Sequence, residues 1–479
     1  MQTAKGKFSI FNLQSSIFSA LALAVMCAVA FVASGSADES VSDAPLRPEY
    51  QHVKQVYSDL FVAKFLHTLD KRLPAKKAYE AVLRQHETSA FVHTQLAGLS
   101  MRVQDIRTAE ASCHRAIALA PDKPEAYFLL GQIMIQRYGD KPDKWKEIVG
   151  LFEKVVELNP NHIEAYQYLG EIAEQTLDYE AAIHAFKELT RIASYHPVFF
   201  VRLGNIYEQL GREAEAVTAY ERAIRIDNDL WDVHRKLGEH YVEQVDQILK
   251  EEALDRNLLV SASENLEKAI RSYAAMRRLA PPGGRGEFDP LLTHFRVRLA
   301  SLYVSIQKAQ EAIAVLGQIL ESEPNNVDAN YWLGIAYQEL DNFEQAERHL
   351  RKTIEFAPER EEVYNALGYL FAEYGTNLDE AVGLIQKALE KSPENGAYLD
   401  SLGWAYFKQG KLYQAAQQLE RAVQHMPDSA EIQDHLGDVY FEQGHREKAL
   451  AAWQKAIELE PENTVIQEKL KRARGEGRD

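Results

Sequence analysis

The sequence has very little cysteine. Only Cys27 and Cys113 occur in 479 residues, and Cys27 lies in an apolar N-terminal run that export would remove or leave in a membrane, so no intramolecular disulfide is expected. Common catalytic and metal-binding signatures are missing too. Neither His-Glu-x-x-His nor Gly-x-Ser-x-Gly occurs, and no histidine pairs with a cysteine at metal-ligand spacing. The glycine-rich residues 283–286 lack the lysine and Ser/Thr of a phosphate loop. We therefore expect no enzyme activity, cofactor or metal.

Positive charge is scarce as well. The chain carries 54 Lys and Arg against 71 Asp and Glu, a formal net charge of −17. Binding to nucleic acid or to an anionic membrane surface needs basic patches that release counterions or meet lipid charge. The composition predicts no nucleic-acid binding, and it favours solubility and basic partners.

The first 40 residues differ from the rest of the chain. A weakly basic start precedes an apolar run from Ile17 to Ala33, and small residues follow before Asp38. This order is typical of a secretory signal, while a run of about 17 residues is at the lower limit for a membrane span. Residues 1–37 are predicted to be a signal peptide or an N-terminal membrane anchor, and residues 38–55 a tether. Acylation of Cys27 is a disfavoured third alternative. We expect an exported chain, in the periplasm or anchored to the inner membrane and facing the periplasm.

One pattern recurs four times between Val327 and Asn463. A Leu-Gly pair is followed three residues later by an aromatic residue, and a proline ends each copy. The glycines stand 34 or 35 residues apart: Gly334, Gly368, Gly403 and Gly437. A fixed period in this range indicates an array of helical repeats. Glycine inside a helix costs about 1 kcal/mol relative to alanine, so we expect these glycines to lie where the paired helix approaches closely. The same holds for Gly131, Gly170, Gly204 and Gly238.

The pattern resembles the tetratricopeptide repeat. In the cleanest copy the residues that carry the resemblance are Leu402, Gly403, Tyr406, Ala415, Leu419, Ala422 and Pro427. The resemblance covers roughly residues 56–463. It implies an all-α fold, a right-handed superhelical α-solenoid of about 10–11 helix-turn-helix repeats.

The repeats are interrupted in the middle of the chain. Residues 231–283 begin and end as a repeat but hold about 19 extra residues, which we interpret as a hairpin of two extended helices that projects from the solenoid. The predicted organisation is an N-terminal array (56–283) with this hairpin at about 244–262, a linker or hinge (284–292), a C-terminal array (293–463), and a capping helix and tail (464–479).

The resemblance also implies where a partner binds. In this family the first helix of each repeat lines a concave groove. The groove positions of the C-terminal array hold Tyr331, Asn365, Tyr369, Asp400, Trp404, Phe407, Asp438 and Phe441. Other residues fill the packing positions, so we expect these side chains to stand clear of the repeat core, although packing against the adjacent repeat is the alternative for Trp404. Aromatic side chains among acidic neighbours favour an extended peptide with apolar and basic side chains.

Two functional hypotheses follow. The first is a non-catalytic scaffold or adaptor for protein–protein interaction in a bacterial cell envelope, with the partner protein or peptide in the groove. The alternative is an accessory subunit of an envelope enzyme complex, in polysaccharide export, glycan processing or protease delivery, whose 244–262 hairpin contacts the catalytic partner.

Overall fold

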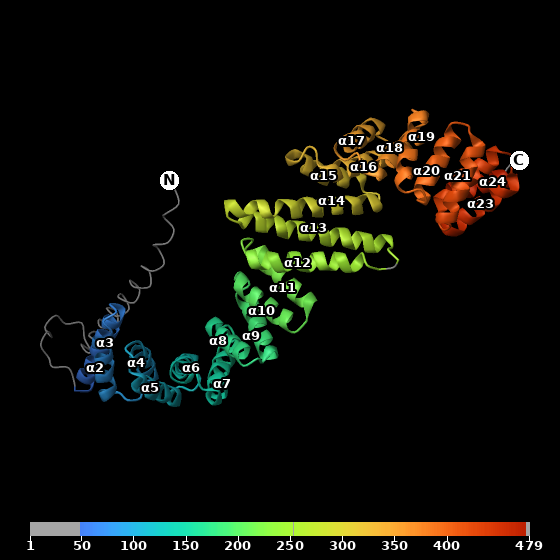
Figure 1. The fold of residues 1–479 in the computed structure, drawn as a ribbon. Helices are drawn as coiled ribbons and strands as arrows, with labels where there is room; N and C mark the ends of the chain where they lie inside the picture. The colour runs from blue at the N-terminus through green and yellow to red at the C-terminus, as the bar shows by residue number, and fades with distance from the viewer. Residues whose placement is uncertain (1–47, 252, 476–479) are drawn as a thin grey trace, which may run out of the picture. The chain divides into compact units, whose positions relative to one another are not determined.

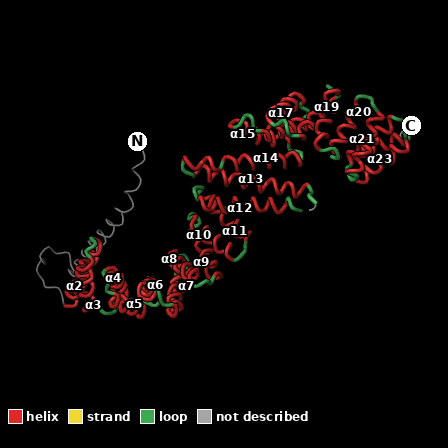
Figure 2. Tube along the Cα trace, viewed as in Figure 1, coloured by secondary structure: helices red, strands yellow, loops and turns green. Residues whose placement is uncertain are grey.

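The described part of the chain is entirely helical apart from its turns. The computed structural model describes residues 48–251 and 253–475, without the side chains of residues 48–54, and no strand occurs among them (Figures 1 and 2). The predicted all-α class is therefore confirmed. The predicted signal peptide or anchor at residues 1–37 lies outside the described residues. Among the helices that the structure does describe, none combines the length and apolar composition needed to cross a membrane.

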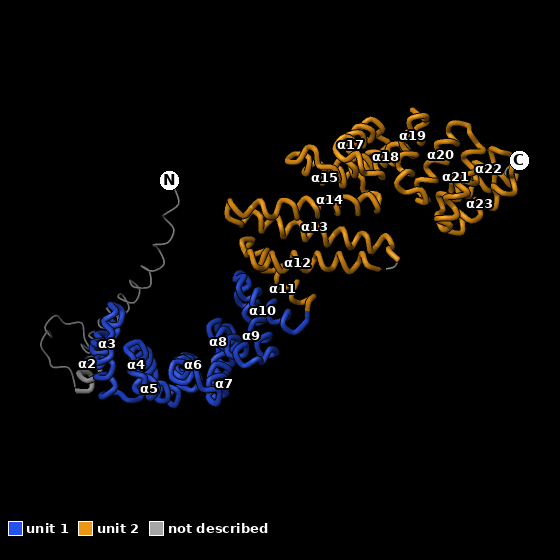
Figure 3. The backbone as a smooth tube through the Cα atoms, in the orientation of Figure 1, with its two compact units in different colours: residues 1–212 blue, residues 213–479 orange. Residues whose placement is uncertain are grey.

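The chain forms two compact units, residues 1–212 and 213–479 (Figure 3). The described helices of the first unit are α2 (Pro48–Thr68), α3 (Arg72–Gln85), α4 (Ala90–Arg102), α5 (Ile106–Leu119), α6 (Pro124–Tyr138), α7 (Trp145–Leu158), α8 (Ile163–Gln175), α9 (Tyr179–Ile192) and α10 (Pro197–Gln209). A short 3-10 helix, Pro142–Lys144, lies in the lengthened turn before α7. Within this unit α2 packs against α3, α4 against α5, α6 against α7 and α8 against α9.

The second unit continues the alternation of first and second helices. Its helices are α11 (Glu213–Ile226), α12 (Trp231–Ile248), α13 (Arg256–Leu279), α14 (Asp289–Ser305), α15 (Ala309–Ser322), α16 (Val327–Glu339), α17 (Phe343–Phe356), α18 (Glu361–Tyr374), α19 (Leu378–Lys391), α20 (Gly396–Lys408), α21 (Leu412–His425), α22 (Ala430–Glu442), α23 (Arg446–Leu459) and α24 (Thr464–Arg474). First helices of neighbouring repeats contact one another directly: α16 with α18, α18 with α20, and α20 with α22.

The turns inside the repeats depend on residues in the left-handed conformation. Gly410 has φ of 74° between α20 and α21, and Gly444 has φ of 79° between α22 and α23, where glycine carries no Cβ penalty. Between repeats, side chains cap the next helix, as Asn326 does by accepting from the backbone N–H of Ala329 at 2.9 Å.

The glycines inside the first helices lie where the second helix approaches. A Cβ added to Gly403 would lie 2.6 Å from Leu419 Cγ and 3.2 Å from the carbonyl oxygen of Ala415. Added Cβ atoms would meet the partner helix at 2.5–2.9 Å at six other repeat positions: Gly131, Gly170, Gly238, Gly334, Gly368 and Gly437. The close approach predicted from the sequence is confirmed at these seven glycines.

The interrupted region differs from its expected form. Both helices of the hairpin are long, as expected, with 18 residues in α12 and 24 in α13, but the hairpin lies beside α14, which has 17 residues (Figure 1). Arg298 of α14 forms a 2.6 Å ion pair with Asp246, and the Arg256 guanidinium donates to the carbonyl oxygen of Ile306 at 3.0 Å. The hairpin is therefore supported along its length instead of projecting freely.

Residues 284–292, expected to be a linker, are also structured. Residues Pro282–Glu287 form a 3-10 helix that packs against α13 and α14, and α14 begins at Asp289. The division between compact units falls after Arg212 instead. The two prolines and three glycines of residues 281–286 shape a tight turn, and turn composition alone does not distinguish a packed turn from a hinge.

Candidate functional site

Acidic residues are concentrated on the first helices of the C-terminal repeats. Helices α16, α18, α20 and α22 together carry ten Asp or Glu and a single basic residue, Lys408. The second helices α17, α19, α21 and α23 carry nine acidic and nine basic residues. Because neighbouring first helices are in contact, α16, α18, α20 and α22 form one continuous row. We call the surface of this row, with its carboxylates, the first-helix face. A face with this charge favours a basic partner.

Six side chains on this face form one group, the Trp404 cluster, which hydrogen bonds, ring stacking and the approach of Glu431 to Asp400 and His435 within 4.8 Å hold together: Tyr369, Glu373, Asp400, Trp404, Glu431 and His435. Trp404 lies at its centre. Its Nε1–H donates to Glu373 Oε2 at 2.8 Å, and its indole stacks on the imidazole of His435 with ring centroids 4.1 Å apart. Nδ1–H of His435 donates in turn to Asp400 Oδ1 at 2.9 Å. These contacts connect α18, α20 and α22.

Burial and neighbouring charge change the acid–base properties of this cluster. Burial would lower the pKa of His435, but the carboxylates of Asp400, Glu431 and Asp434 outweigh it and raise that pKa above its ordinary value. Burial, followed by the charge of Glu431, raises the pKa of Tyr369, whose hydroxyl donates to Glu431 Oε1 at 3.1 Å. Tyr369 therefore stays protonated, and His435 retains its positive charge to a higher pH than a free histidine.

The cluster also contains a donor set suited to a cation. Oxygen atoms of Asp400 and Glu431 and a nitrogen of His435 lie within 4.8 Å of one another, and Asp400 and His435 are buried. Both Asp400 and His435 are already engaged in their mutual hydrogen bond, and Glu431 accepts from Tyr369. The protein's own hydrogen bonds account for this arrangement, and we assign no metal to it.

A second site lies between α20, α22, α23 and α24. This site is a pocket of about 220 Å³, which we call the α22–α24 pocket. It is lined by Phe407, Asp438, Phe441, Glu442, Trp453, Lys469 and Arg472. Aromatic rings form part of its wall, since Phe441 and Trp453 have centroids 5.5 Å apart. Lys469 Nζ donates to both Asp434 and Asp438, at 2.7 and 2.8 Å. Burial raises the pKa of Asp438 and Lys469 opposes this shift. An apolar wall beside charged groups is typical of a pocket that holds one side chain of a partner.

The structure divides the eight predicted site residues into three groups. Tyr369, Asp400 and Trp404 fall in the Trp404 cluster, and Phe407, Asp438 and Phe441 line the α22–α24 pocket. Phe407 also stacks on Trp404, with centroids 5.0 Å apart, and so joins the two sites.

The remaining two predicted residues, Tyr331 and Asn365, lie outside both sites. The guanidinium of Arg360 covers the ring of Tyr331 at 4.8 Å. Arg360 also pairs with Asp328 at 2.6 Å and with Glu362. Asn365 is half-buried, and its Oδ1 is buried without a hydrogen-bond partner in the described part of the chain.

The expectation that these aromatic side chains stand clear of the repeat core is wrong for Trp404. It is 8% exposed and belongs to the core of the C-terminal repeats, and Tyr369 and Phe407 are half-buried against that core. The physical reason is that first helices of neighbouring repeats touch, so a large side chain at a groove position packs against the next first helix. Sequence reasoning also missed His435, Lys469 and Arg472. The signal that finds this face is the uneven distribution of charge between first and second helices.

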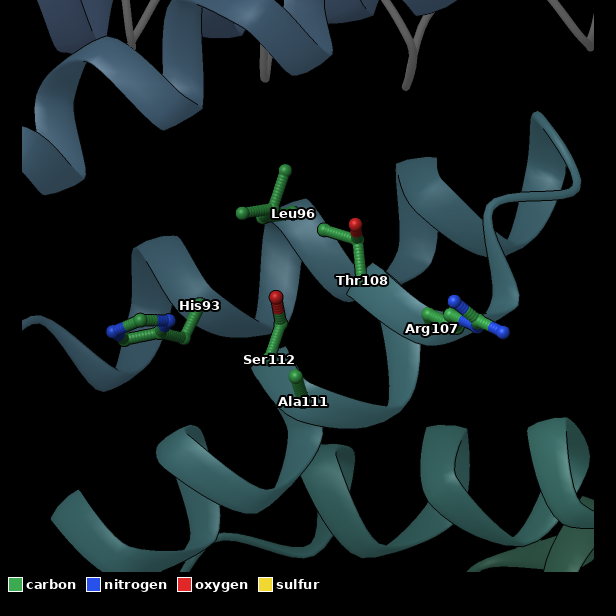
Figure 4. Close-up of a pocket in the computed structure, with 6 residues that line it drawn as sticks. All are labelled: His93, Leu96, Arg107, Thr108, Ala111 and Ser112. Atoms are coloured by element: carbon green, nitrogen blue, oxygen red, sulfur yellow. The ribbon is translucent and has the colours of Figure 1, made fainter.

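Another pocket, of about 340 Å³, lies along α4 and α5 (Figure 4). It is lined by His93, Leu96, Arg107, Thr108, Ala111 and Ser112. His93 and Arg107 lie at opposite sides of this group and do not point toward each other (Figure 4). Nothing in the arrangement pairs a nucleophile with a base, and none of the predicted site residues lies there.

Comparison with known proteins identifies the repeats. A tetratricopeptide repeat model matches residues 307–368, a TPR repeat model matches residues 204–245 and 403–444, and a second tetratricopeptide repeat model matches residues 430–463. A TPR repeat-containing protein of Pseudomonas aeruginosa is 34% identical over 113 residues, which are 24% of this chain and 19% of that protein. The peroxisomal targeting signal receptor of Candida albicans is 21% identical over 230 residues, 43% of this chain and 37% of the receptor.

The matched regions are thus a minor part of both relatives. Among solved structures, a tetratricopeptide repeat protein from Parabacteroides merdae is 18% identical, with 65% of this chain and 98% of that chain covered and a TM-score of 0.34.

Proposed function

We propose, from the premise that this chain is a tetratricopeptide repeat protein, that it is a non-catalytic scaffold which binds a basic, extended segment of a partner protein along the first-helix face. Proteins built from this repeat generally mediate protein–protein interaction. The observation that carries the proposal is the charge distribution, with ten acidic residues and one basic residue on the first helices and nine of each on the second helices.

The exposed carboxylates are the groups that meet the partner. Glu373, Glu431 and Glu442 are exposed on α18 and α22, and the net charge of −17 adds long-range attraction for a basic chain. Asp400 and Asp438 are instead paired with the cationic side chains of His435 and Lys469, and these pairs hold the helices together. Glu373 and Glu431 also accept hydrogen bonds, from Trp404 and Tyr369, but these donors are neutral and leave the negative charge of the carboxylates available to a partner.

The α22–α24 pocket fixes the register of the bound segment. Its aromatic wall, which includes Phe407 and Phe441, accepts one apolar side chain, while Glu442 at the pocket attracts a neighbouring cation. A segment with an apolar residue beside lysine or arginine satisfies both features. Main-chain extension lets successive side chains reach the pocket and the glutamates.

We place this interaction in the bacterial cell envelope. The support is the order of charge and apolar residues over residues 1–38, which is typical of an exported or anchored chain. Fractionation of cells that express the full chain tests the location. Recovery in the cytosol with residues 1–37 intact would contradict it.

Crosslinked capture from cell envelopes tests the binding face. The test variant replaces Glu373, Glu431 and Glu442 by glutamine, which removes three charges and keeps the side-chain size and one hydrogen-bond-accepting oxygen at each position. The matched control replaces Glu355, Glu390 and Glu458, which are exposed on the second helices α17, α19 and α23. We expect a captured protein that is lost with the test variant and retained with the control. Equal capture by both variants would overturn the proposed face.

A further inference from the structure

Helix α2, the first helix in the described part of the chain, has a broad exposed apolar surface. Four large side chains of α2, one in the turn after it and one of α3 are 45–61% exposed: Tyr57, Phe61, Val62, Phe65, Leu69 and Leu73. We call this surface the N-terminal apolar face. Tyr57, Phe61 and Phe65 are spaced four residues apart and so form one stripe along α2, and Leu69 follows directly after the end of the helix. The rings of Phe61 and Phe65 stack on each other with centroids 6.2 Å apart.

The opposite side of α2 is apolar as well. Ala63 is fully buried, and Val56, Leu60 and Leu66 pack against the core that α2 shares with α3 and α4. The core accounts for one side only. Polar residues such as Asp59 and Lys64 also lie on α2, but an exposed patch of aromatic side chains is typical of an interaction surface.

The last helix of the array shows how such a surface is otherwise closed. Helix α24 buries Ile466, Leu470 and Ala473 against α23, and it exposes Lys471 and Arg472 to solvent. Repeat arrays need a terminal unit with a polar outer side to remain soluble. Helix α24 meets this requirement, but α2 does not, because its outer side carries aromatic residues.

We propose that the N-terminal apolar face binds the same face of a second copy of this chain, so that the protein is a twofold dimer through α2. A twofold interface brings the same surface of both copies together. In an antiparallel pair centred between Phe61 and Phe65, Tyr57 meets Leu69 of the other copy, and Phe61 meets Phe65 of the other copy. The stripe is therefore complementary to itself.

The area of the face agrees with such a dimer. An aromatic side chain buries on the order of 150–250 Å², so six side chains that are about half exposed offer on the order of 500 Å² per copy. Two copies then bury on the order of 1,000 Å², which reaches the lower limit for a specific interface. The dimer is independent of the first-helix face, which lies in the other compact unit.

Crosslinking of the full chain in cells tests this interface. We would replace Phe61 by cysteine and add a short bis-maleimide. Tyr413→Cys is the matched control, since Tyr413 is 77% exposed on α21, and the wild-type chain reports any background from its own cysteines. The proposal predicts a product of twice the chain mass with Phe61→Cys and neither with Tyr413→Cys nor with the wild type.

Each other product contradicts the proposal. An adduct with a different protein identifies a foreign partner, and an intrachain link to Cys27 identifies residues 1–47 as the occupant. If no crosslinked product forms, the N-terminal apolar face contacts lipid or solvent instead of protein, and the dimer is also overturned.

A mass measurement gives an independent answer. The double variant Phe61→Glu/Phe65→Glu places two charges in the centre of the interface, and it should raise the dimer dissociation constant by about 100-fold or more. Sedimentation of the full chain in detergent would then show a monomer, while Tyr413→Glu stays dimeric. A wild-type chain that sediments as a monomer would refute the proposal directly.

Discussion

Gly403 allows a quantitative test of how the repeats pack. In the structure an added Cβ would lie 2.6 Å from Leu419 Cγ, 3.2 Å from Leu419 Cδ2 and 3.2 Å from the carbonyl oxygen of Ala415. Leu419 Cγ is the branch point of a buried side chain, and the Ala415 oxygen belongs to the backbone. Neither atom can move aside without a cost in free energy. Gly403→Ala must therefore separate α20 from α21 or displace Leu419.

The expected free-energy change is the difference of two terms. Overpacking a core by a methyl group costs about 1–3 kcal/mol, and alanine regains up to about 1 kcal/mol of helix propensity. We expect Gly403→Ala to lower the free energy of unfolding by about 0.5–2 kcal/mol, and Gly403→Leu to lower it further.

Gly383 provides the matched control for this prediction. It lies in α19, is exposed, and has no atom within 4 Å of an added Cβ. Gly383→Ala keeps the propensity gain without the clash, so it should raise stability by about 0.5–1 kcal/mol. Urea unfolding followed by tryptophan fluorescence gives the midpoints of all three chains. A Gly403→Ala midpoint at or above that of the wild type would refute the proposed packing, as would equal losses in both variants.

Four further predictions concern charge and burial. Burial, with Arg348 and Lys352 nearby, lowers the pKa of His349 to about 4. The stability that neutral His349 contributes is therefore present above pH 6.5 and is lost as pH falls through 4. Titration of the His349 ring by NMR checks this pKa, and an ordinary histidine pKa would contradict the prediction. The pKa of His435 is raised, so the pH dependence of its contribution to stability has the opposite sign. This contribution is present below pH 6.5 and is lost as pH rises through the pKa of His435 in the folded protein. It should be absent from the pH–stability profile of His435→Gln. Lys469→Met leaves Asp434 and Asp438 without their shared cation and should lower the free energy of unfolding by about 1–3 kcal/mol in thermal unfolding. Adding Asp434→Asn and Asp438→Asn should restore much of this stability. No rescue would show that the lost ion pairs are not the cause of the destabilisation. Burial raises the pKa of Cys113 to about 12, so a thiol reagent should label it only at the rate of unfolding, and rapid labelling of the native chain at pH 8 would count against its burial.

The repeat period carries most of the information on the fold. Gly334, Gly368, Gly403 and Gly437 fixed both the helix pairing and the register, because a period of 34 or 35 residues with a small residue at one position leaves few other arrangements. The path of residues 244–292 could not be predicted in the same way. Contacts such as Arg298 with Asp246 join residues 52 positions apart, and no periodic signal reports them.

The candidate site was predictable in position but not in detail. The groove positions selected Phe407, Asp438 and Phe441, which do line one pocket. The repeat register did not predict how exposed each side chain at a groove position is. Trp404 is buried because His435 of the next first helix covers its ring, and Asp400 is occupied because the same histidine donates to it. Contacts between repeats depend on which residues face each other across two copies, so they need the structure.

Selection of peptides on the immobilised full chain tests most directly whether the first-helix face binds a basic segment. A library of random extended peptides would be enriched on the wild-type chain and on the Glu373→Gln/Glu431→Gln/Glu442→Gln variant, and the recovered sequences compared. We predict that the wild type enriches peptides with lysine or arginine beside an apolar residue, and that the variant loses this enrichment. Enrichment of acidic or uncharged peptides, or the same basic peptides on both chains, would contradict the proposed function.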